Sequence, residues 1–168
     1  MKIIIEGCDG TGKTTIAKKL AKKYKCDVIH MTSKDPKDFN FYSQSLRKTK
    51  AIYDRNFISE LIYPKVFKRD SVAITTDEFK LLLKHAKEED VLIVILTASR
   101  YDISTRLHER TNEPEEILKK YVWIDKQYRK IANKYYIPLI ETSYATPGDV
   151  CRQIEAIMSF RSYRVWKI

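Results

Sequence analysis

The sequence predicts an α/β fold in which a five-stranded parallel sheet lies between two layers of helices. Two observations carry this prediction. Short apolar runs alternate with helical patterns along the chain, and the run 91–96, expected in the middle of the sheet, is apolar without interruption. Strands of a parallel sheet are buried on both faces and therefore read as continuous apolar runs, whereas their connections are helical. With 168 residues, 43% of them hydrophobic, the chain is expected to form a single domain over 1–168.

The individual elements follow from apolar runs and from helical periodicity. The expected strands are 2–6, 27–31, 50–54, 91–96 and 137–141. The expected helices place apolar residues at steps of three and four, and they cover 13–24, 36–47, 56–67, 76–87, 100–110, 115–135 and 147–160. Thr75 and Glu78 predict a capping box at the start of the fourth helix, because each side chain can accept from the other's backbone N–H.

A phosphate-binding motif lies between the first strand and the first helix. Residues 7–14, Gly-Cys-Asp-Gly-Thr-Gly-Lys-Thr, follow the pattern G-x-x-x-x-G-K-[ST]. Its backbone N–H groups can surround phosphate oxygens, and the helix N-terminus adds positive partial charge. We expect Lys13 to reach the β- and γ-phosphates of ATP and the Thr14 hydroxyl to ligate Mg²⁺. The motif predicts a P-loop NTPase fold, with nucleotide contacts from Gly7, Gly10, Thr11, Gly12, Lys13, Thr14 and Thr15.

Three further charged residues are expected near the phosphates. Asp54 and Arg55 end a strand that should lie beside the first strand, at the carboxyl edge where open parallel sheets bind ligands. Asp54 is suited to hold Mg²⁺ through water, and Arg55 to bind an acceptor phosphate; the alternative is a buried ion pair between them. Asp9 is expected to orient the acceptor or help to organise Mg²⁺, unless it only caps the loop.

The cation for the transferring phosphoryl group is expected from a short lid at about 106–115. Arg106 and Arg110 lie four residues apart and thus on one helix face. Phosphoryl transfer needs positive charge on the transferring group, and the phosphate loop itself contains no arginine. We favour Arg106; the alternatives are Arg100 and a solvated basic face. Phe39 is expected to stack on an acceptor base, although aromatic residues at this spacing also suit a core.

Composition limits the partners. The net charge is +10, from 32 Lys and Arg against 22 Asp and Glu, which suits a polyanionic substrate or simply solvated helix faces. The basic and aromatic segment 161–167 suits nucleic acid or packing on its own domain. Three cysteines without C-x-x-C spacing predict neither a metal site nor disulfides, and no apolar run approaches membrane length. A cytoplasmic protein without a membrane partner is therefore expected.

These motifs resemble those of the thymidylate kinases and their nucleoside and nucleotide kinase relatives. Residues 5–15 resemble the family's E-G-x-D-G-x-G-K-x-T opening, and Asp54-Arg55 with Ser59 and Tyr63 resembles its D-R-x-x-x-S-x-x-x-Y segment. Residues 32–36 are similar to its T-R-E-P, 96–110 to its strand, helix and lid, and 142–154 to its adenine-side loop and last helix. The chain departs from the family at Asn56, where a tyrosine is usual, and in the short segment 36–54, which normally helps to wall the acceptor base.

The resemblance implies transfer of the γ-phosphoryl group of ATP to a nucleotide, with Mg²⁺ as cofactor. The expected acceptor is a deoxynucleoside monophosphate such as dTMP or a pyrimidine analogue, because Asp9 and Arg55 favour an acceptor that already bears phosphate. One alternative is a kinase of the same fold acting on a nucleoside, or on a modified base or an end in DNA. Another is a protein that only binds or hydrolyses nucleotide, which the absence of D-x-x-G and N-K-x-D disfavours. A homodimer stays open.

Overall fold

The computed structural model describes residues 1–32, 34–48, 50–67, 74–111 and 115–160, and for residues 110, 111 and 115–117 the backbone alone. Five parallel strands form the sheet in the order β2-β3-β1-β4-β5. The strands are β1 (Lys2–Gly7), β2 (Asp27–His30), β3 (Ala51–Asp54), β4 (Val91–Thr97) and β5 (Leu139–Glu141). The predicted parallel α/β sheet is confirmed. β4 is apolar apart from Thr97, β1 has a central run of three isoleucines, and both strands are almost fully buried, as strands covered on both faces must be.

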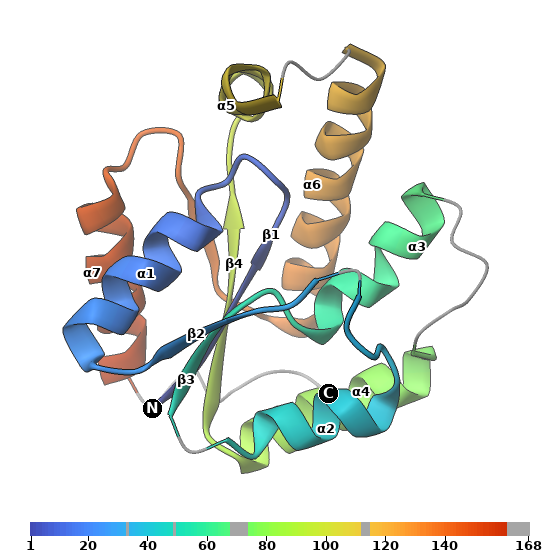
Figure 1. Ribbon diagram of the computed structural model, residues 1–168, viewed down its shortest axis with the longest axis vertical. Helices are drawn as coiled ribbons and strands as arrows, with labels where there is room; N and C mark the ends of the chain where they lie inside the picture. The colour runs from blue at the N-terminus through green and yellow to red at the C-terminus, as the bar shows by residue number, and fades with distance from the viewer. Residues whose placement is uncertain (33, 49, 68–73, 112–114, 161–168) are drawn as a thin grey trace.

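Helices cover both faces of the sheet (Figure 1). On one face α1 (Lys13–Tyr24) and α7 (Pro147–Ser159) pack on Ile3, Ile5 and Val94. The other face is covered by α2 (Phe39–Leu46), α4 (Thr76–Glu88), α6 (Glu115–Tyr135) and two short elements, the 3₁₀ helix η1 (Phe57–Leu61) and α3 (Tyr63–Val66). Helix α5 (Arg100–Thr111) follows β4 at its carboxyl end. The result is the three-layer sandwich that the sequence predicts.

Two helices differ from their predicted bounds for identifiable reasons. The helix expected from residue 36 begins at Phe39, because the Asp38 side chain accepts from the Phe41 N–H and caps it there. The helix expected over 56–67 is instead η1 followed by α3, with the break at Ile62. Pro64 has no N–H to continue a hydrogen-bond ladder back to Glu60, which accounts for the break. The capping box of Thr75 and Glu78 is confirmed.

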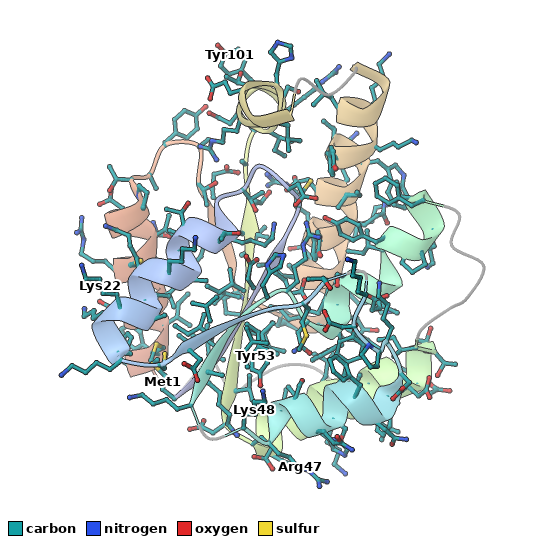
Figure 2. All side chains as sticks on the ribbon, viewed as in Figure 1. Met1, Lys22, Arg47, Lys48, Tyr53 and Tyr101 are labelled. Atoms are coloured by element: carbon teal, nitrogen blue, oxygen red, sulfur yellow. The ribbon has the colours of Figure 1, made fainter. Side chains whose placement is uncertain are left out.

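Figure 2 shows Tyr53 within the fold and Lys22, Arg47 and Lys48 at its surface. Tyr53 on β3 is fully buried, and its hydroxyl donates to the Ser45 carbonyl of α2. Lys22, Arg47 and Lys48 are exposed, which fits the interpretation of much of the net charge as solvated surface. Among the described residues, no helix has the length and apolar character needed to cross a membrane.

Candidate active site

The phosphate loop joins β1 to α1 through backbone that only glycine adopts readily. Gly7 has φ of 139°, and a Cβ built there would lie 2.2 Å from the Leu96 carbonyl oxygen of the neighbouring strand. Gly12 has φ of 86° and forms the N-cap of α1. A side chain would therefore clash at Gly7 and strain the backbone at Gly12. The glycines hold the loop tightly against the sheet while leaving the helix N-terminus open.

A cavity of about 120 Å³ lies over this loop, and we call it the phosphate cavity. Its lining comprises Asp9, Gly10, Gly12, Lys13, Thr14, Thr15, His30, Asp54 and Arg55. The Lys13 ammonium donates to the Cys8 carbonyl oxygen at 2.7 Å, and the Thr11 hydroxyl donates to the same oxygen at 2.8 Å. Burial, together with the nearby Arg55, lowers the pKa of Lys13. The structure thus brings the predicted loop residues Gly10, Gly12, Lys13, Thr14 and Thr15 around one small polar cavity.

The end of β3 supplies a buried carboxylate to the same cavity. Asp54 is fully buried, and its Oδ2 accepts from the Thr14 hydroxyl at 2.5 Å and lies 3.0 Å from His30 Nδ1. Its Oδ1 has no hydrogen-bond partner within the described part of the chain. A buried carboxylate oxygen left without a donor, beside a threonine hydroxyl, fits a Mg²⁺ ion that takes its other ligands from phosphates and water. Thr14 and Asp54 are the residues that would hold it.

Arg55 occupies the junction between the phosphate loop and a second cavity. The Arg55 Nη2 atom donates to Asp9 Oδ1 and, at 2.8 Å, to the Tyr63 hydroxyl. The Tyr63 hydroxyl in turn donates to Asp9 Oδ2 at 3.2 Å. The Arg55 Nε–H is buried without a hydrogen-bond partner among the described residues. Burial would raise the pKa of Asp9, but Lys13 and Arg55 outweigh it and lower that pKa. Asp9 is therefore an anion clamped between two cations, and Arg55 pairs with Asp9 rather than with Asp54.

The backbone conformation of Arg55 depends on Glu6 of β1. Arg55 has φ of 71°, a left-handed conformation that costs a residue with a Cβ about 1–2 kcal/mol. Glu6 Oε1 accepts from the N–H groups of Asn56 and Ile58 at 2.8 and 3.1 Å, and Oε2 accepts from the Tyr128 hydroxyl of α6 at 3.0 Å. This fully buried carboxylate fixes the turn that aims Arg55 at the cavity. Its burial raises the pKa of Glu6 to about 7, against partial offsets from Asn56 and Tyr128.

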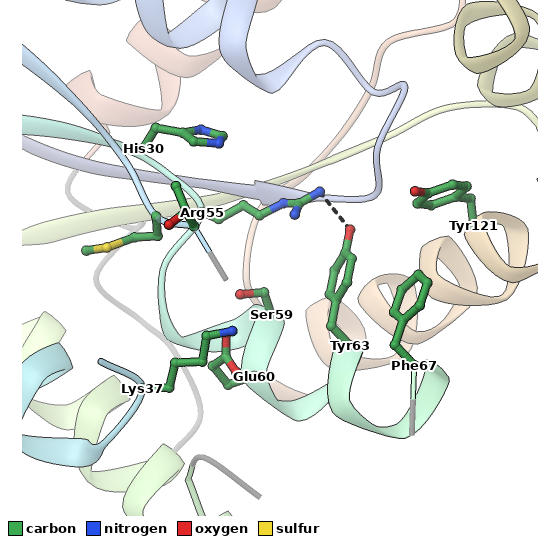
Figure 3. Close-up of a pocket in the computed structure, with 10 residues that line it drawn as sticks. His30, Lys37, Arg55, Ser59, Glu60, Tyr63, Phe67 and Tyr121 are labelled. Atoms are coloured by element: carbon green, nitrogen blue, oxygen red, sulfur yellow. Dashed lines mark hydrogen bonds and ion pairs between the residues drawn. The ribbon is translucent and has the colours of Figure 1, made fainter. Parts of the chain in front are cut away.

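The second cavity, which we call the acceptor cavity, measures about 350 Å³. Arg55 and His30 belong to its lining as well as to that of the phosphate cavity. Figure 3 shows Tyr63, Phe67 and Tyr121 grouped on one side and Lys37 and Glu60 together on another, with Ser59 between Glu60 and Arg55. The rings of Tyr63 and Phe67 stack, with centroids 5.9 Å apart. Aromatic walls with a few convergent charged groups are typical of a site for a small planar ligand.

A third cavity, the donor-side cavity, measures about 220 Å³ and lies on the other side of the phosphate loop. It shares Gly10, Gly12 and Thr15 with the phosphate cavity. Thr142 and Ala145 of the loop before α7, and Pro147 at the start of that helix, line its other side. Arg106 of α5 also lines it. The Arg106 Nη1 atom donates to the Gly10 carbonyl oxygen at 3.0 Å and to the Thr142 hydroxyl at 3.2 Å. In this structure Arg106 therefore lies beside the donor-side cavity, outside the lining of the phosphate cavity.

Several predicted site residues lie elsewhere. Phe39 is half-buried and contacts the His85 ring, with centroids 5.8 Å apart, and it is absent from the lining of the acceptor cavity. The Arg110 side chain lies outside the described residues, as do lid residues 112–114 and the tail 161–168. Gly7 shapes the loop without lining the phosphate cavity. The roles expected of Arg106 and Arg110 in phosphoryl transfer stay predictions.

Sequence reasoning did not single out several residues that line the site, among them His30, Lys37, Glu60 and Tyr121. They come from the end of β2, the segment before α2, η1 and α6. The helical stripe through Tyr121 predicts core, and Tyr121 does pack at the core's edge while also lining the cavity. The strand ends offered a usable signal for His30, because parallel strands present their carboxyl-terminal residues at one edge. Lys37 and Glu60 carry no local pattern that distinguishes them from surface charges.

Comparison with known proteins agrees with this geometry. The thymidylate kinase family model matches residues 5–63, which is 59 of 168 residues. Among solved structures, the YorR protein of Bacillus subtilis, in complex with phosphorylated GDP, has a TM-score of 0.81 and 24% identity, covering 97% of this chain and 98% of its own. Thymidylate kinase from Candida albicans has a TM-score of 0.63 and 18% identity, covering 99% and 94%. No curated protein sequence matches the chain significantly.

A third solved structure extends the likeness to nucleoside kinases. Deoxyadenosine kinase from M. mycoides, with the products dCMP and dCDP bound, has a TM-score of 0.56 and 21% identity, covering 95% of this chain and 97% of its own. The matched segment 5–63 contains the phosphate loop, Asp54, Arg55, Ser59 and Tyr63. The resemblance to thymidylate kinases is thus confirmed over residues 5–63, and the chain shares the fold of the solved nucleotide and nucleoside kinases.

Proposed function

We propose that this chain transfers the γ-phosphoryl group of ATP to a nucleoside monophosphate, with deoxynucleoside monophosphates as the acceptors that the family resemblance favours. The observation that carries the proposal is the continuity of the three cavities. The phosphate cavity shares loop residues with the donor-side cavity and shares His30 and Arg55 with the acceptor cavity. Two nucleotides can therefore approach one phosphate site from opposite sides, as in-line transfer requires.

Different residues would bind the donor, the metal ion and the acceptor. The donor base would occupy the cavity between the phosphate loop and Thr142, and its β- and γ-phosphates would lie over Lys13. An oxygen of the acceptor phosphate attacks the γ-phosphorus, the bond to the β-phosphate oxygen breaks, and ADP and a nucleoside diphosphate result. Mg²⁺, held by Thr14 and Asp54, would screen the phosphate charge. Arg55, with its unused Nε–H, would bind the acceptor phosphate beside Asp9.

The charge at Arg55 supports an acceptor that already bears phosphate. Arg55 lines both the phosphate cavity and the acceptor cavity, and a nucleoside would present only a neutral hydroxyl there. Deoxyadenosine kinase from M. mycoides, which holds dCMP as a product, supports a nucleoside acceptor as the second candidate. A nucleic-acid acceptor and a homodimer have no comparable support among the described residues.

The proposal is tested by the release of ADP from ATP and Mg²⁺ in the presence of single acceptors. Wild-type protein should release ADP with at least one nucleoside monophosphate and far more slowly without an acceptor. Lys13→Ala should abolish this release, whereas Lys22→Ala, on the exposed face of the same helix, should retain it. Release only with nucleosides, only with oligonucleotides, or equally without any acceptor would contradict the proposal.

A further inference from the structure

We propose that the acceptor base is guanine, or a base with the same edge, and that Glu60 and Lys37 select it. This inference rests on the proposed function. It concerns the side of the acceptor cavity away from Arg55, where a base must lie if the acceptor phosphate meets Arg55. Figure 3 shows Lys37 and Glu60 together in that region, with the aromatic rings of Tyr63, Phe67 and Tyr121 on another side of the same cavity.

Glu60 is unusual as a cavity residue because it is a buried carboxylate on a fixed element. Its side chain is 7% exposed, and that of Lys37 is 21% exposed. The Tyr42 hydroxyl of α2 donates a hydrogen bond to Glu60, and this contact restrains the carboxylate. Lys37 Nζ lies 3.6 Å from Glu60 Oε1, which is an ion-pair distance longer than a hydrogen bond. Because this contact uses at most one of its three N–H groups, the ammonium keeps donors for a ligand.

The chemistry of this pair discriminates between bases. An ionised carboxylate only accepts hydrogen bonds, and an ammonium only donates them. Guanine presents two neighbouring donors, its ring N1–H and its exocyclic amino group, next to the O6 acceptor. The donors match the two carboxylate oxygens, and O6 matches the ammonium. Thymine instead has a single ring N–H between two carbonyl oxygens. These oxygens only accept hydrogen bonds, so they would lie beside carboxylate oxygens that also only accept.

The remaining bases fall between these extremes. Adenine and cytosine each offer one amino group beside a ring nitrogen that only accepts, so they satisfy one carboxylate oxygen and set an acceptor against the other. A site built on buried polar groups rejects ligands that leave those groups unpaired much more strongly than it rejects a change of size. The expected order of kcat/KM is therefore dGMP first, then dAMP and dCMP, then dTMP. This order replaces the pyrimidine preference expected from the sequence.

The first test compares acceptors on the wild-type enzyme. kcat/KM for dGMP should exceed that for dTMP by about 10-fold to 100-fold, the usual effect of a hydrogen bond to a charged group. Deoxyinosine monophosphate keeps O6 and N1–H but lacks the amino group, and it should lose about 10-fold relative to dGMP. Preference for dTMP, or equal use of dGMP and deoxyinosine monophosphate, would overturn the inference. This comparison needs no variant and is independent of any folding defect.

The second test assigns the preference to Glu60. E60Q keeps the size of the side chain but replaces one acceptor by a donor. It should lower kcat/KM for dGMP by about 10-fold or more and leave that for dTMP within about 3-fold. E88Q, a half-exposed carboxylate on α4, is the matched control and should change neither. An equal loss for all bases in E60Q would reduce Glu60 to a structural role and refute the inference.

The two proposals fail differently. If wild-type enzyme phosphorylates monophosphates but prefers dTMP, the guanine inference fails while the proposed kinase function stands. If no monophosphate is phosphorylated under any condition, the proposed function fails, and the inference fails with it.

Discussion

The two sides of the active site are built in different ways. The donor side depends on one continuous segment, 7–15, whose glycines, Lys13 and Thr14 are placed by the turn from β1 into α1. The acceptor side is assembled from the ends of β2 and β3, the segment before α2, and η1, α3 and α6. A continuous loop carries its chemistry in local sequence, whereas an assembled cavity depends on packing. Arg55 belongs to both sides, and the following variants separate them.

The largest effect is expected from Lys13→Ala. In the proposed function its ammonium lies over the β- and γ-phosphates, and one preorganised charge contact of this kind is commonly worth ~3 kcal/mol in a transition state. kcat should therefore fall by at least ~10²-fold, with an unchanged circular dichroism spectrum. Substantial activity in purified Lys13→Ala would show that the loop does not form the transfer site.

A stability measurement probes Glu6, the buried carboxylate that holds the turn at Arg55. Burial raises the pKa of Glu6 from 4.5 to about 7, and Tyr128, Tyr42, Arg55 and Lys13 are the titratable or charged groups that face it. Because this pKa is higher in the folded than in the unfolded protein, the folded protein binds more protons between pH 4.5 and 7. The contribution of Glu6 to the free energy of unfolding therefore falls as pH rises through that window, by up to about 3 kcal/mol.

Glu6→Gln removes this titration while keeping acceptors for the Asn56 and Ile58 N–H groups. The free energy of unfolding of wild type minus that of Glu6→Gln, measured by urea at pH 4.5 and pH 8, should be smaller at pH 8 by an amount approaching that value. Other carboxylates titrate in both proteins and cancel in the difference. Parallel pH curves would place Glu6 in a more polar environment than the structure shows.

Arg55→Ala should affect the acceptor side selectively. kcat/KM for the monophosphate should fall by about 10-fold to 100-fold, the range expected for a lost hydrogen bond to a charged group. The Kd of ATP, measured by calorimetry without acceptor, should change by less than about 3-fold. A collapse of ATP affinity would instead assign Arg55 to the donor site or to the fold.

The smallest effect is expected from Arg106→Ala, on the donor side. Arg106 donates to the Gly10 carbonyl oxygen and to Thr142, so its loss should loosen the wall of the donor-side cavity. The Kd of ATP should rise by about 5-fold to 10-fold. A fall in kcat with unchanged ATP affinity would instead support the role in phosphoryl transfer that the sequence suggests, with Arg106 moving to the phosphates on closure of the lid.

The same contrast explains what the sequence could predict. The strands, the parallel sheet and the loop residues follow from apolar periodicity and from a motif with fixed spacing. Asp54 and Arg55 could be placed because parallel strands end at one edge of the sheet. The sequence predicts that Phe39 stacks on the acceptor base. In the structure Asp38 caps the helix that begins at Phe39, and the Phe39 ring contacts the His85 ring. Lys37 and Glu60 meet through the packing of η1 against the segment before α2, which no local sequence pattern encodes.

Identification of the phosphorylated product is the most direct test of the central claim that ATP and a monophosphate meet at one phosphate site. Protein, Mg²⁺ and ATP labelled at the γ-phosphate are incubated with dGMP, and the labelled products are separated. We predict that the label appears in the β-phosphate of dGDP, in equal amount to the ADP formed, and that Lys13→Ala abolishes it. Label found only in inorganic phosphate would contradict the account.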